Sequence, residues 1–228
     1  MIKYLLIILY IPISWYHAIT CRSQSLAKRY ERLRKDCLKL LRLVKLDLEV
    51  EGLENLKDVE VASFISNHQG TLDPLFIVAA CPIPLTFVSK IENKKMIFLS
   101  SWAKSIEVFY FDREDTSSSI HMIRETARFL KEKRSTLIFA EGTRSHGKAM
   151  NEMKAAAFKP AQIAKVPVVA VSLINSYDGM SEIKKSGRVK IVFNQPYMIE
   201  KAKVEDTARH VQQLIQADLD RSVIDSLN

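Results

Sequence analysis

Cysteine is scarce in this sequence, whose 228 residues include only Cys21, Cys37 and Cys81. The three are scattered and odd in number, so they match neither a disulfide framework nor the ligand spacing of a zinc site. Such sparse use of cysteine is typical of a protein from a reducing compartment.

The sequence also lacks the common patterns of covalent catalysis. It contains no Gly-x-Ser-x-Gly stretch, the pattern that presents a nucleophilic serine on a sharp turn. No cysteine stands beside His68, and no cluster of metal ligands is visible. The sequence therefore favours chemistry without a covalent enzyme intermediate, a metal ion or a bound cofactor.

Repeats, low-complexity segments and internal linkers are absent as well, so nothing divides residues 46–228. The length suits one domain with a small appendage. The formal net charge of +8 favours a polyanionic partner, such as a phosphorylated substrate, an anionic membrane surface or nucleic acid. Nucleic acid is the weakest of these, because the aromatic residues are not interleaved with basic ones on any one element.

Residues 4–19 form an almost wholly apolar run that is interrupted by Pro12, Ser14 and His17. As a helix the run would be roughly 24 Å long, which is shorter than the ~30 Å hydrocarbon core of a bilayer. A cleaved signal peptide is an alternative, but residues 18–20 make a poor cleavage site. We expect an uncleaved anchor that dips into one leaflet or barely spans the membrane.

A strongly basic segment follows the apolar run and carries apolar residues at helical spacing. It predicts an amphipathic helix on an anionic membrane surface, with the rest of the chain on the cytoplasmic side. Residues 1–45 would then form the membrane-docking part and residues 46–228 the main domain. The alternative is a helix that covers the core with a solvated face. The basic residues are Arg22, Lys28, Arg29, Arg32, Arg34, Lys35, Lys39, Arg42 and Lys45.

After residue 45 the chain alternates between strand-like and helix-like runs. This alternation predicts an α/β fold with a mixed, largely parallel sheet flanked by helices. The expected strands are 46–50, 61–66, 85–89, 108–111, 136–140, 168–173 and 189–193, and the expected helices are 115–133, 153–165 and 203–223. The first of these helices should bury Ile120, Ile123, Ala127 and Leu130.

The segment 67–73 lies between the expected strand 61–66 and a helix that begins near Pro74. Asp73 suits the N-cap of that helix and Pro74 its first residue. This arrangement could turn the Asp73 carboxylate back onto one ring nitrogen of His68, which leaves the other nitrogen free to accept a proton. Alternatively, Asp73 is only a helix cap and His68 only a loop residue.

Charged residues follow two further strands. Arg113 comes after the aromatic run 108–112, and Arg144 belongs to the Glu-Gly-Thr-Arg stretch 141–144. Lys154 begins the next expected helix. Because active sites of α/β proteins gather at strand ends, two arginines and a lysine there would suit a phosphate group. Either arginine could instead be an ordinary surface charge.

These segments, in this order, resemble the four motifs of the glycerolipid acyltransferases. Within that family they look most like those of the bacterial 1-acyl-glycerol-3-phosphate acyltransferases. The motifs correspond to Asn67-His68-x-x-x-x-Asp73, the aromatic run ending in Arg113, Phe139-Ala140-Glu141-Gly142-Thr143-Arg144, and Val166-Pro167-Val168-Val169. The resemblance covers roughly residues 46–200, and the N-terminal part looks like the membrane-docking helix pair of that family.

The resemblance implies transfer of a fatty acyl group to lysophosphatidic acid, giving phosphatidic acid for phospholipid biosynthesis. The acyl donor would be acyl-CoA or acyl-[acyl carrier protein], and no cofactor would be bound. His68 would be the general base and Asp73 would orient it. Arg113, Arg144 and Lys154 would hold the phosphate of the acceptor, and Glu141, Gly142 and Thr143 would shape the acceptor site.

The sequence departs from the family pattern at five positions. Gly70 replaces a usual serine, Glu107 and Ala156 replace common glycines, and Ala140 and Ala170 replace common prolines. None of these changes removes a group that transfers protons or binds phosphate. They favour one alternative, another acceptor such as glycerol 3-phosphate or a different lysophospholipid. Two further alternatives are a hydrolase, in which the same His and Asp activate water, and a non-catalytic protein that binds anionic lipid, which the net charge of +8 suggests.

Overall fold

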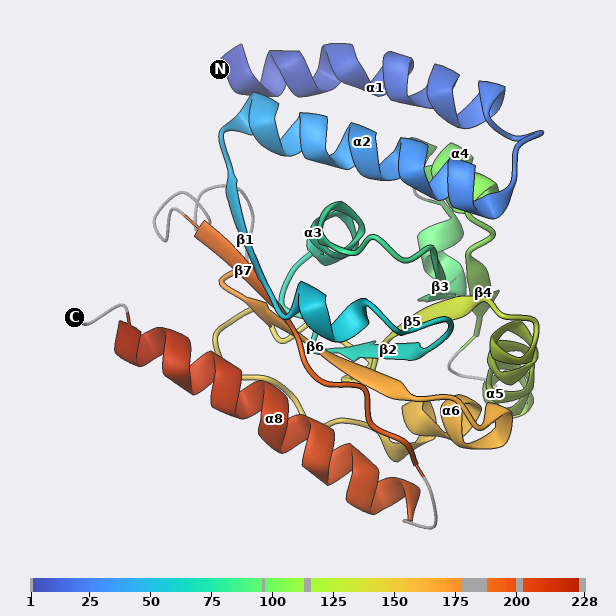
Figure 1. The fold of residues 1–228 in the computed structure, drawn as a ribbon. Coiled ribbons are helices and arrows are strands. Elements are labelled where there is room, and N and C mark those ends of the chain that lie inside the picture. The colour runs from blue at the N-terminus through green and yellow to red at the C-terminus, as the bar shows by residue number, and fades with distance from the viewer. Residues whose placement is uncertain (1, 96, 113–115, 178–187, 200–202, 226–228) are drawn as a thin grey trace.

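The computed structural model of the chain describes all residues except 1, 96, 113–115, 178–187, 200–202 and 226–228 (Figure 1). At its centre is a seven-stranded sheet with the strand order β1-β7-β6-β2-β5-β3-β4. Among the described strands, β6 and β7 pair antiparallel, and the other neighbouring strands are parallel. The predicted mixed, largely parallel sheet is therefore confirmed. The strands are β1 (Asp47–Glu51), β2 (Ser63–Ser66), β3 (Leu85–Lys90), β4 (Phe109–Phe111), β5 (Ser135–Phe139), β6 (Val168–Ile174) and β7 (Arg188–Phe193).

Helices cover both faces of the sheet (Figure 1). One face carries α1 (Ile2–Thr20), α2 (Leu26–Val44), α3 (Asp73–Ala80) and α4 (Ile97–Ser105). The other face carries α5 (Thr116–Lys131), α6 (Lys159–Ala164) and α8 (Val204–Asp225). Three short 3₁₀ helices complete the described elements: η1 (Leu53–Leu56), η2 (Ile91–Lys95) and η3 (Ala155–Phe158).

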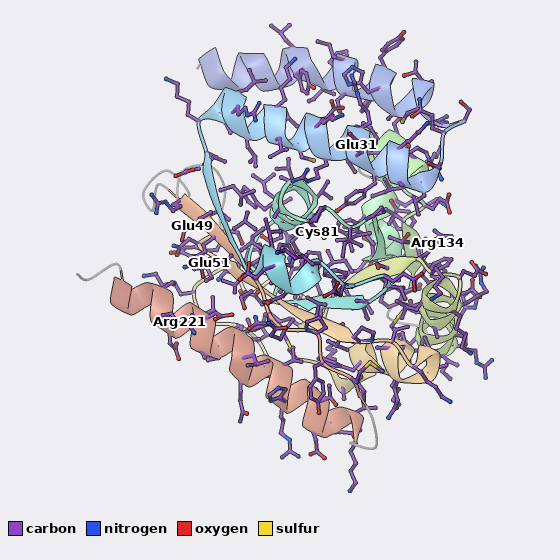
Figure 2. All side chains as sticks on the ribbon, in the orientation of Figure 1. Glu31, Glu49, Glu51, Cys81, Arg134 and Arg221 are labelled. Atoms are coloured by element: carbon purple, nitrogen blue, oxygen red, sulfur yellow. The ribbon has the colours of Figure 1, made fainter. Side chains whose placement is uncertain are left out.

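Neighbouring residues of the central strands belong to two separate hydrophobic cores, one on each face of the sheet. Phe64 of β2 packs with the side chains of α2 and α3, whereas the next residue, Ile65, packs with those of α6 and α8. Leu137 and Ile138 of β5 divide between the two cores in the same way. Side chains alternate across a strand, so continuous apolar runs are what a sheet buried on both faces requires. All three cysteines are free and buried, and Cys81 lies beside α3 (Figure 2).

Four details differ from the predictions. The helix expected over 153–165 is divided into η3 and α6, because Pro160 lacks an N–H and would clash with the preceding turn of a continuous helix. The N-cap of α3 is Leu72, and Asp73 is its first residue. The prediction that Ile120 is buried is wrong, because its side chain is 49% exposed on α5. The helix α4 was not predicted.

The two N-terminal helices pack as an outer layer, with α2 between α1 and α3 (Figure 1). Their contact is centred on Asp36 of α2, which is 3% exposed. Its carboxylate accepts hydrogen bonds from Tyr10 (2.8 Å), Ser14 (2.9 Å) and His17 (2.9 Å), all on one side of α1. Apolar residues cover the opposite side of α1 and are exposed: Ile8, Leu9, Ile13, Tyr16 and Ile19. Within the described part of the chain, no helix combines the length and apolar character needed to cross a membrane.

Candidate active site

The candidate active site lies at the carboxyl ends of β2 and β5, two parallel neighbours in the middle of the sheet. Ser66 of β2 pairs with Phe139 of β5. His68 and Glu141 each come two residues after this pair, so the register brings the first and third motifs together. This is the edge of an α/β sheet at which ligands bind.

His68 and Asp73 form the predicted pair. The Nδ1 atom of His68 lies 2.7 Å from Oδ2 of Asp73, and the aspartate side chain is fully buried. The carboxylate accepts the hydrogen on Nδ1, which leaves Nε2 as the basic nitrogen of the ring. The imidazole stacks on Phe139 with ring centroids 4.1 Å apart, and 20% of its side chain remains exposed. The pair can therefore remove a proton from a hydroxyl group that approaches Nε2.

The same Asp73 oxygen also shapes the loop before α3. It accepts hydrogen bonds from the amide N–H groups of Gln69 (2.7 Å) and Gly70 (2.9 Å). A buried carboxylate that accepts three hydrogen bonds fixes both the loop and the ring orientation. Asp73 thus makes the contact with His68 that the spacing predicted, while its capping partners lie in the loop rather than in the helix.

The loop is also tied to β6. The side chain of Asn67 continues the strand pairing by donating to the carbonyl of Leu173 (2.9 Å) and accepting from its N–H (2.8 Å). Gln69 accepts from the N–H of Ser176 (3.0 Å). A side-chain carbon at Gly70 would lie 2.3 Å from the carbonyl oxygen of Ser176. The backbone approach at this point explains why glycine stands where the family usually has serine.

Glu141 is buried behind the loop that carries His68. Its side chain is 2% exposed, and both carboxylate oxygens accept hydrogen bonds from backbone amides. Oε1 accepts from the N–H of His68 (2.6 Å) and Oε2 from the N–H of Asn151 (2.7 Å). Burial raises the pKa of Glu141, although these hydrogen bonds oppose the shift.

Two of the predicted cationic residues lie beside this loop. Arg144 donates a hydrogen bond to the hydroxyl of Thr71, between His68 and Asp73 in the chain. Lys154 passes over Gly142, where an added side-chain carbon would lie 3.1 Å from both Cε and Nζ of the lysine. Gly142 has a φ of +80°, which favours glycine in any case. Together the two cations can attract an anionic group near His68.

Two predicted site residues remain, Thr143 and Arg113. Thr143 is exposed between Gly142 and Arg144. Arg113 lies outside the described residues. Among the described residues, no group of three or more His, Cys, Asp or Glu side chains could hold a metal ion.

Sequence reasoning missed several residues that build the site. Phe139 supports the imidazole, Thr71 holds Arg144, and the amide of Asn151 holds Glu141. Thr71 and Phe139 lie inside the recognised motifs, so their positions in the sequence could have identified them as residues of the site. Asn151 contacts Glu141 through its backbone N–H as well as through its side chain, and the backbone contact leaves no trace in residue type.

A family model described as "Acyltransferase" matches residues 47–174, which contain all the predicted site residues. The chain belongs to the acyltransferase family. The resemblance predicted from the four motifs is thereby confirmed, and the His68–Asp73 pair lies within the matched acyltransferase segment.

Curated relatives of this acyltransferase carry related names. A probable 1-acyl-sn-glycerol-3-phosphate acyltransferase of Mycoplasma genitalium is 29% identical over 178 residues, covering 69% of this chain and 66% of that protein. The Mycoplasma pneumoniae protein of the same name is 27% identical, with 76% of this chain and 71% of that protein covered. A chloroplastic 1-acyl-sn-glycerol-3-phosphate acyltransferase of Arabidopsis thaliana is 30% identical, with 69% and 45% covered. The matched part is thus about two thirds of the first relative and less than half of the plant protein.

A solved structure has the same fold. The 1-acyl-sn-glycerophosphate acyltransferase of Thermotoga maritima superposes with a TM-score of 0.75 at 18% identity, covering 96% of this chain and 92% of that chain. The likeness extends over the N-terminal helices as well as the sheet of the acyltransferase.

Proposed function

We propose that the protein transfers a fatty acyl group from an acyl thioester to the sn-2 hydroxyl of 1-acyl-glycerol 3-phosphate, giving phosphatidic acid. The donor would be the thioester of coenzyme A or of acyl carrier protein. The observation that carries the proposal is the 2.7 Å contact between His68 and the fully buried Asp73, with Nε2 left basic at the edge of the sheet. The names of the relatives support lysophosphatidic acid as the acceptor.

In this mechanism the acyl group passes directly from sulfur to oxygen. Nε2 of His68 removes the proton of the acceptor hydroxyl as its oxygen attacks the thioester carbonyl. Asp73 stabilises the resulting imidazolium through the hydrogen on Nδ1. The carbon–sulfur bond then breaks, and the imidazolium returns the proton to the leaving thiolate. The ester bond formed and the thioester bond broken balance the reaction without a metal or a cofactor.

The cationic residues would hold the phosphate of the acceptor during this transfer. Arg144 is oriented by Thr71, and Lys154 lies against Gly142 on the same loop system. A guanidinium binds a phosphate with paired hydrogen bonds and an ammonium adds a point charge. Arg113 would join them according to the family motif, and Thr143 would line the glycerol part.

The direct test is an acyl-transfer assay with the full chain in lipid or detergent. Both thioester donors are offered with lysophosphatidic acid, glycerol 3-phosphate and a lysophospholipid that lacks a phosphomonoester. We expect phosphatidic acid as the main product, and a loss of about 100-fold or more in kcat for His68→Ala. His210→Ala, an exposed histidine on α8, is the matched control and should retain activity. Equal activity of His68→Ala and the parent would exclude His68 as the base, and a preference for either other acceptor would change the substrate.

We also propose that α1 and α2 dock the enzyme on the cytoplasmic face of an anionic membrane. In water a helix normally buries its apolar side, yet α1 turns its polar residues toward Asp36 and exposes its apolar side. Hydrocarbon is the environment in which this orientation is stable. Exposed basic residues of the same helix pair supply attraction to anionic headgroups: Arg22, Lys28, Lys35, Lys39, Arg42 and Lys45.

Of the residues named for this attraction, Lys35 pairs on the surface with Glu31 (2.6 Å), and three other basic residues of the predicted membrane helix are engaged within the protein. Arg29 forms an ion pair with Glu107 (2.6 Å), and Arg34 donates to the carbonyl of Ala79 (3.1 Å). Arg32 donates to Nε2 of His17. The electrostatic part of membrane docking therefore rests on fewer charges than the sequence suggested.

A further inference from the structure

Glu141 belongs to the third motif, but its carboxylate is buried and is hydrogen-bonded within the protein. The side chain is 2% exposed, and one backbone amide occupies each oxygen. A carboxylate can only accept hydrogen bonds, and here its shortest contacts are to N–H groups of the protein itself. The geometry does not offer Glu141 to the glycerol hydroxyls of an acceptor.

One of the two amides that Glu141 holds is that of His68. The other is that of Asn151, three residues before Lys154. The same two segments are joined again by backbone hydrogen bonds from Ser145 N–H to the His68 carbonyl (2.8 Å) and from His146 N–H to the Gln69 carbonyl (3.2 Å). Glu141 is therefore a side chain that joins the backbone of His68 directly to the loop that leads to Lys154.

We propose that Glu141 is a positioning residue, which sets where the His68 backbone lies and hence where Nε2 points relative to Arg144 and Lys154. The inference rests on the function proposed above and deepens it. Asp73 fixes the rotation of the imidazole, whereas Glu141 fixes the position of the backbone from which the imidazole extends. Both are required, because a displacement of about 1 Å at a reacting group can cost roughly 100-fold in rate.

The substitution Glu141→Gln tests this role with little change in shape. The amide oxygen can replace one carboxylate oxygen, but the NH₂ group then faces a backbone N–H, so one of the two hydrogen bonds is lost. We expect kcat to fall about 10- to 100-fold, while KM for lysophosphatidic acid changes less than about threefold. Glu152→Gln, an exposed glutamate in the same loop, is the matched control and should behave as the parent.

A second readout does not depend on turnover. The ¹⁵N resonances of the His68 ring report its environment, and they should shift in Glu141→Gln but not in Glu152→Gln. If neither the parent nor any variant transfers an acyl group, the proposed function is wrong. The shift of the ring resonances would still report whether Glu141 positions the His68 ring. If Glu141→Gln does not fold, Glu141→Asp is assayed by the same two criteria, since its shorter side chain can hold only one of the two amides.

Other outcomes would overturn the inference. A rise of tenfold or more in KM for the acceptor with kcat unchanged would mean that Glu141 contacts the acceptor directly. Parent-like kcat together with unshifted ring resonances would mean that the carboxylate has no role in positioning His68.

Discussion

Glu107 occupies a position at the end of α4 where glycine is the usual residue. It follows α4 with a φ of +59°, in the left-handed region. The N–H of Glu107 bonds to the carbonyl of Lys104 and that of Val108 to the carbonyl of Ala103, which is the Schellman pattern of a helix end. Glycine is the usual residue at this point of the pattern, and glycine is also common here in the family. Glu107 offsets part of the backbone strain through ion pairs with Arg29 (2.6 Å) and Arg134 (2.8 Å), the latter marked in Figure 2.

The substitutions Glu107→Gly and Glu107→Ala both remove the ion pairs, but they differ in their effect on the backbone strain. Glu107→Gly relieves the strain of a side chain at positive φ, whereas Glu107→Ala keeps it. We therefore expect Glu107→Gly to be more stable than Glu107→Ala by about 1 kcal/mol. Urea unfolding of the two variants measures the difference directly. Equal stability would show that the backbone relaxes out of the left-handed region when the ion pairs are removed.

Among the secondary-structure elements, the edge strand β1 is held to β7 by charge as well as by backbone pairing. Glu49 lies opposite Lys190 in the register, and its carboxylate contacts Arg188 (2.9 Å) and Lys190 (3.3 Å) (Figure 2). Lys190 also contacts Glu51 (2.6 Å). Charged side chains of this kind occur on sheet edges, where they discourage pairing with another chain.

The pKa of Glu49 gives this element a pH signature. Burial alone would raise the pKa, but hydrogen bonds from Lys190 and Arg188 outweigh it and hold the pKa below its usual value. A carboxyl group whose pKa is lowered by folding contributes stability above its unfolded pKa and loses it as the pH falls through the folded pKa. We expect Glu49→Gln to reduce the free energy of unfolding by up to about 1 kcal/mol near neutral pH, and by progressively less below about pH 4.5.

Denaturation curves of the parent and Glu49→Gln at several pH values measure this difference. Glu54→Gln, an exposed glutamate on η1, controls for the change in net charge alone. A difference that grows as the pH falls would contradict the ion-pair explanation.

The helix ends show why element boundaries were harder to predict than the elements themselves. The alternation of apolar runs was sufficient for the strands, because a sheet buried on both faces needs such runs. Helix ends are usually marked by glycine, but the chain has only six glycines. Four helices end instead with a charged residue at positive φ: Lys45, Glu107, Lys133 and Lys165. Lysine and glutamate are ordinary helix formers, so these ends left no signal in the sequence.

The candidate site was predictable to the extent that it depends on side chains with a distinctive chemistry. The spacing of His68 and Asp73 anticipated their contact, and the Glu-Gly-Thr-Arg stretch located Arg144 near it. Several of the links between the motifs were not predictable, because they run through backbone groups. Asn67 reaches the backbone of β6 and Glu141 reaches two amides, and neither contact can be inferred before the strand register is known.

At the scale of the whole molecule, α1 forms the outermost layer on one face of the sheet (Figure 1), and its exposed residues include Ile8, Leu9 and Ile13. In the sequence, Ser14 and His17 looked like interruptions of an apolar anchor. In the structure they form its inner side, where Nδ1 of His17 donates to Asp36, and Trp102 of α4 donates to Ser14 (2.7 Å). These contacts hold α1 so that its apolar residues face away from the protein.

This orientation predicts that the apolar side of α1 controls binding to lipid. Ile13 on α1 and Ile163 on α6 are almost equally exposed, at 47% and 46%, but they lie on opposite faces of the sheet. If the α1 side enters the bilayer, Ile13→Asp loses the burial of an isoleucine and adds a charge in an apolar environment. We expect its partition into vesicles containing anionic lipid to weaken by tenfold or more, because burying such a side chain contributes about 1.5–3 kcal/mol. Ile163→Asp introduces the same charge and should partition as the parent does.

Co-sedimentation with vesicles of neutral or mixed neutral and anionic lipid separates the two forces in this docking. Added salt should weaken the binding of the parent to anionic vesicles, since exposed Lys and Arg are screened over about 10 Å at moderate salt. The Ile13→Asp effect should persist in salt, because it concerns the apolar contact. Equal weakening by Ile13→Asp and Ile163→Asp would point to net charge as the cause. Unchanged binding of Ile13→Asp would mean that the exposed side of α1 does not enter the bilayer and is covered in some other way, for example by a second copy of the chain, which sedimentation without lipid would then detect.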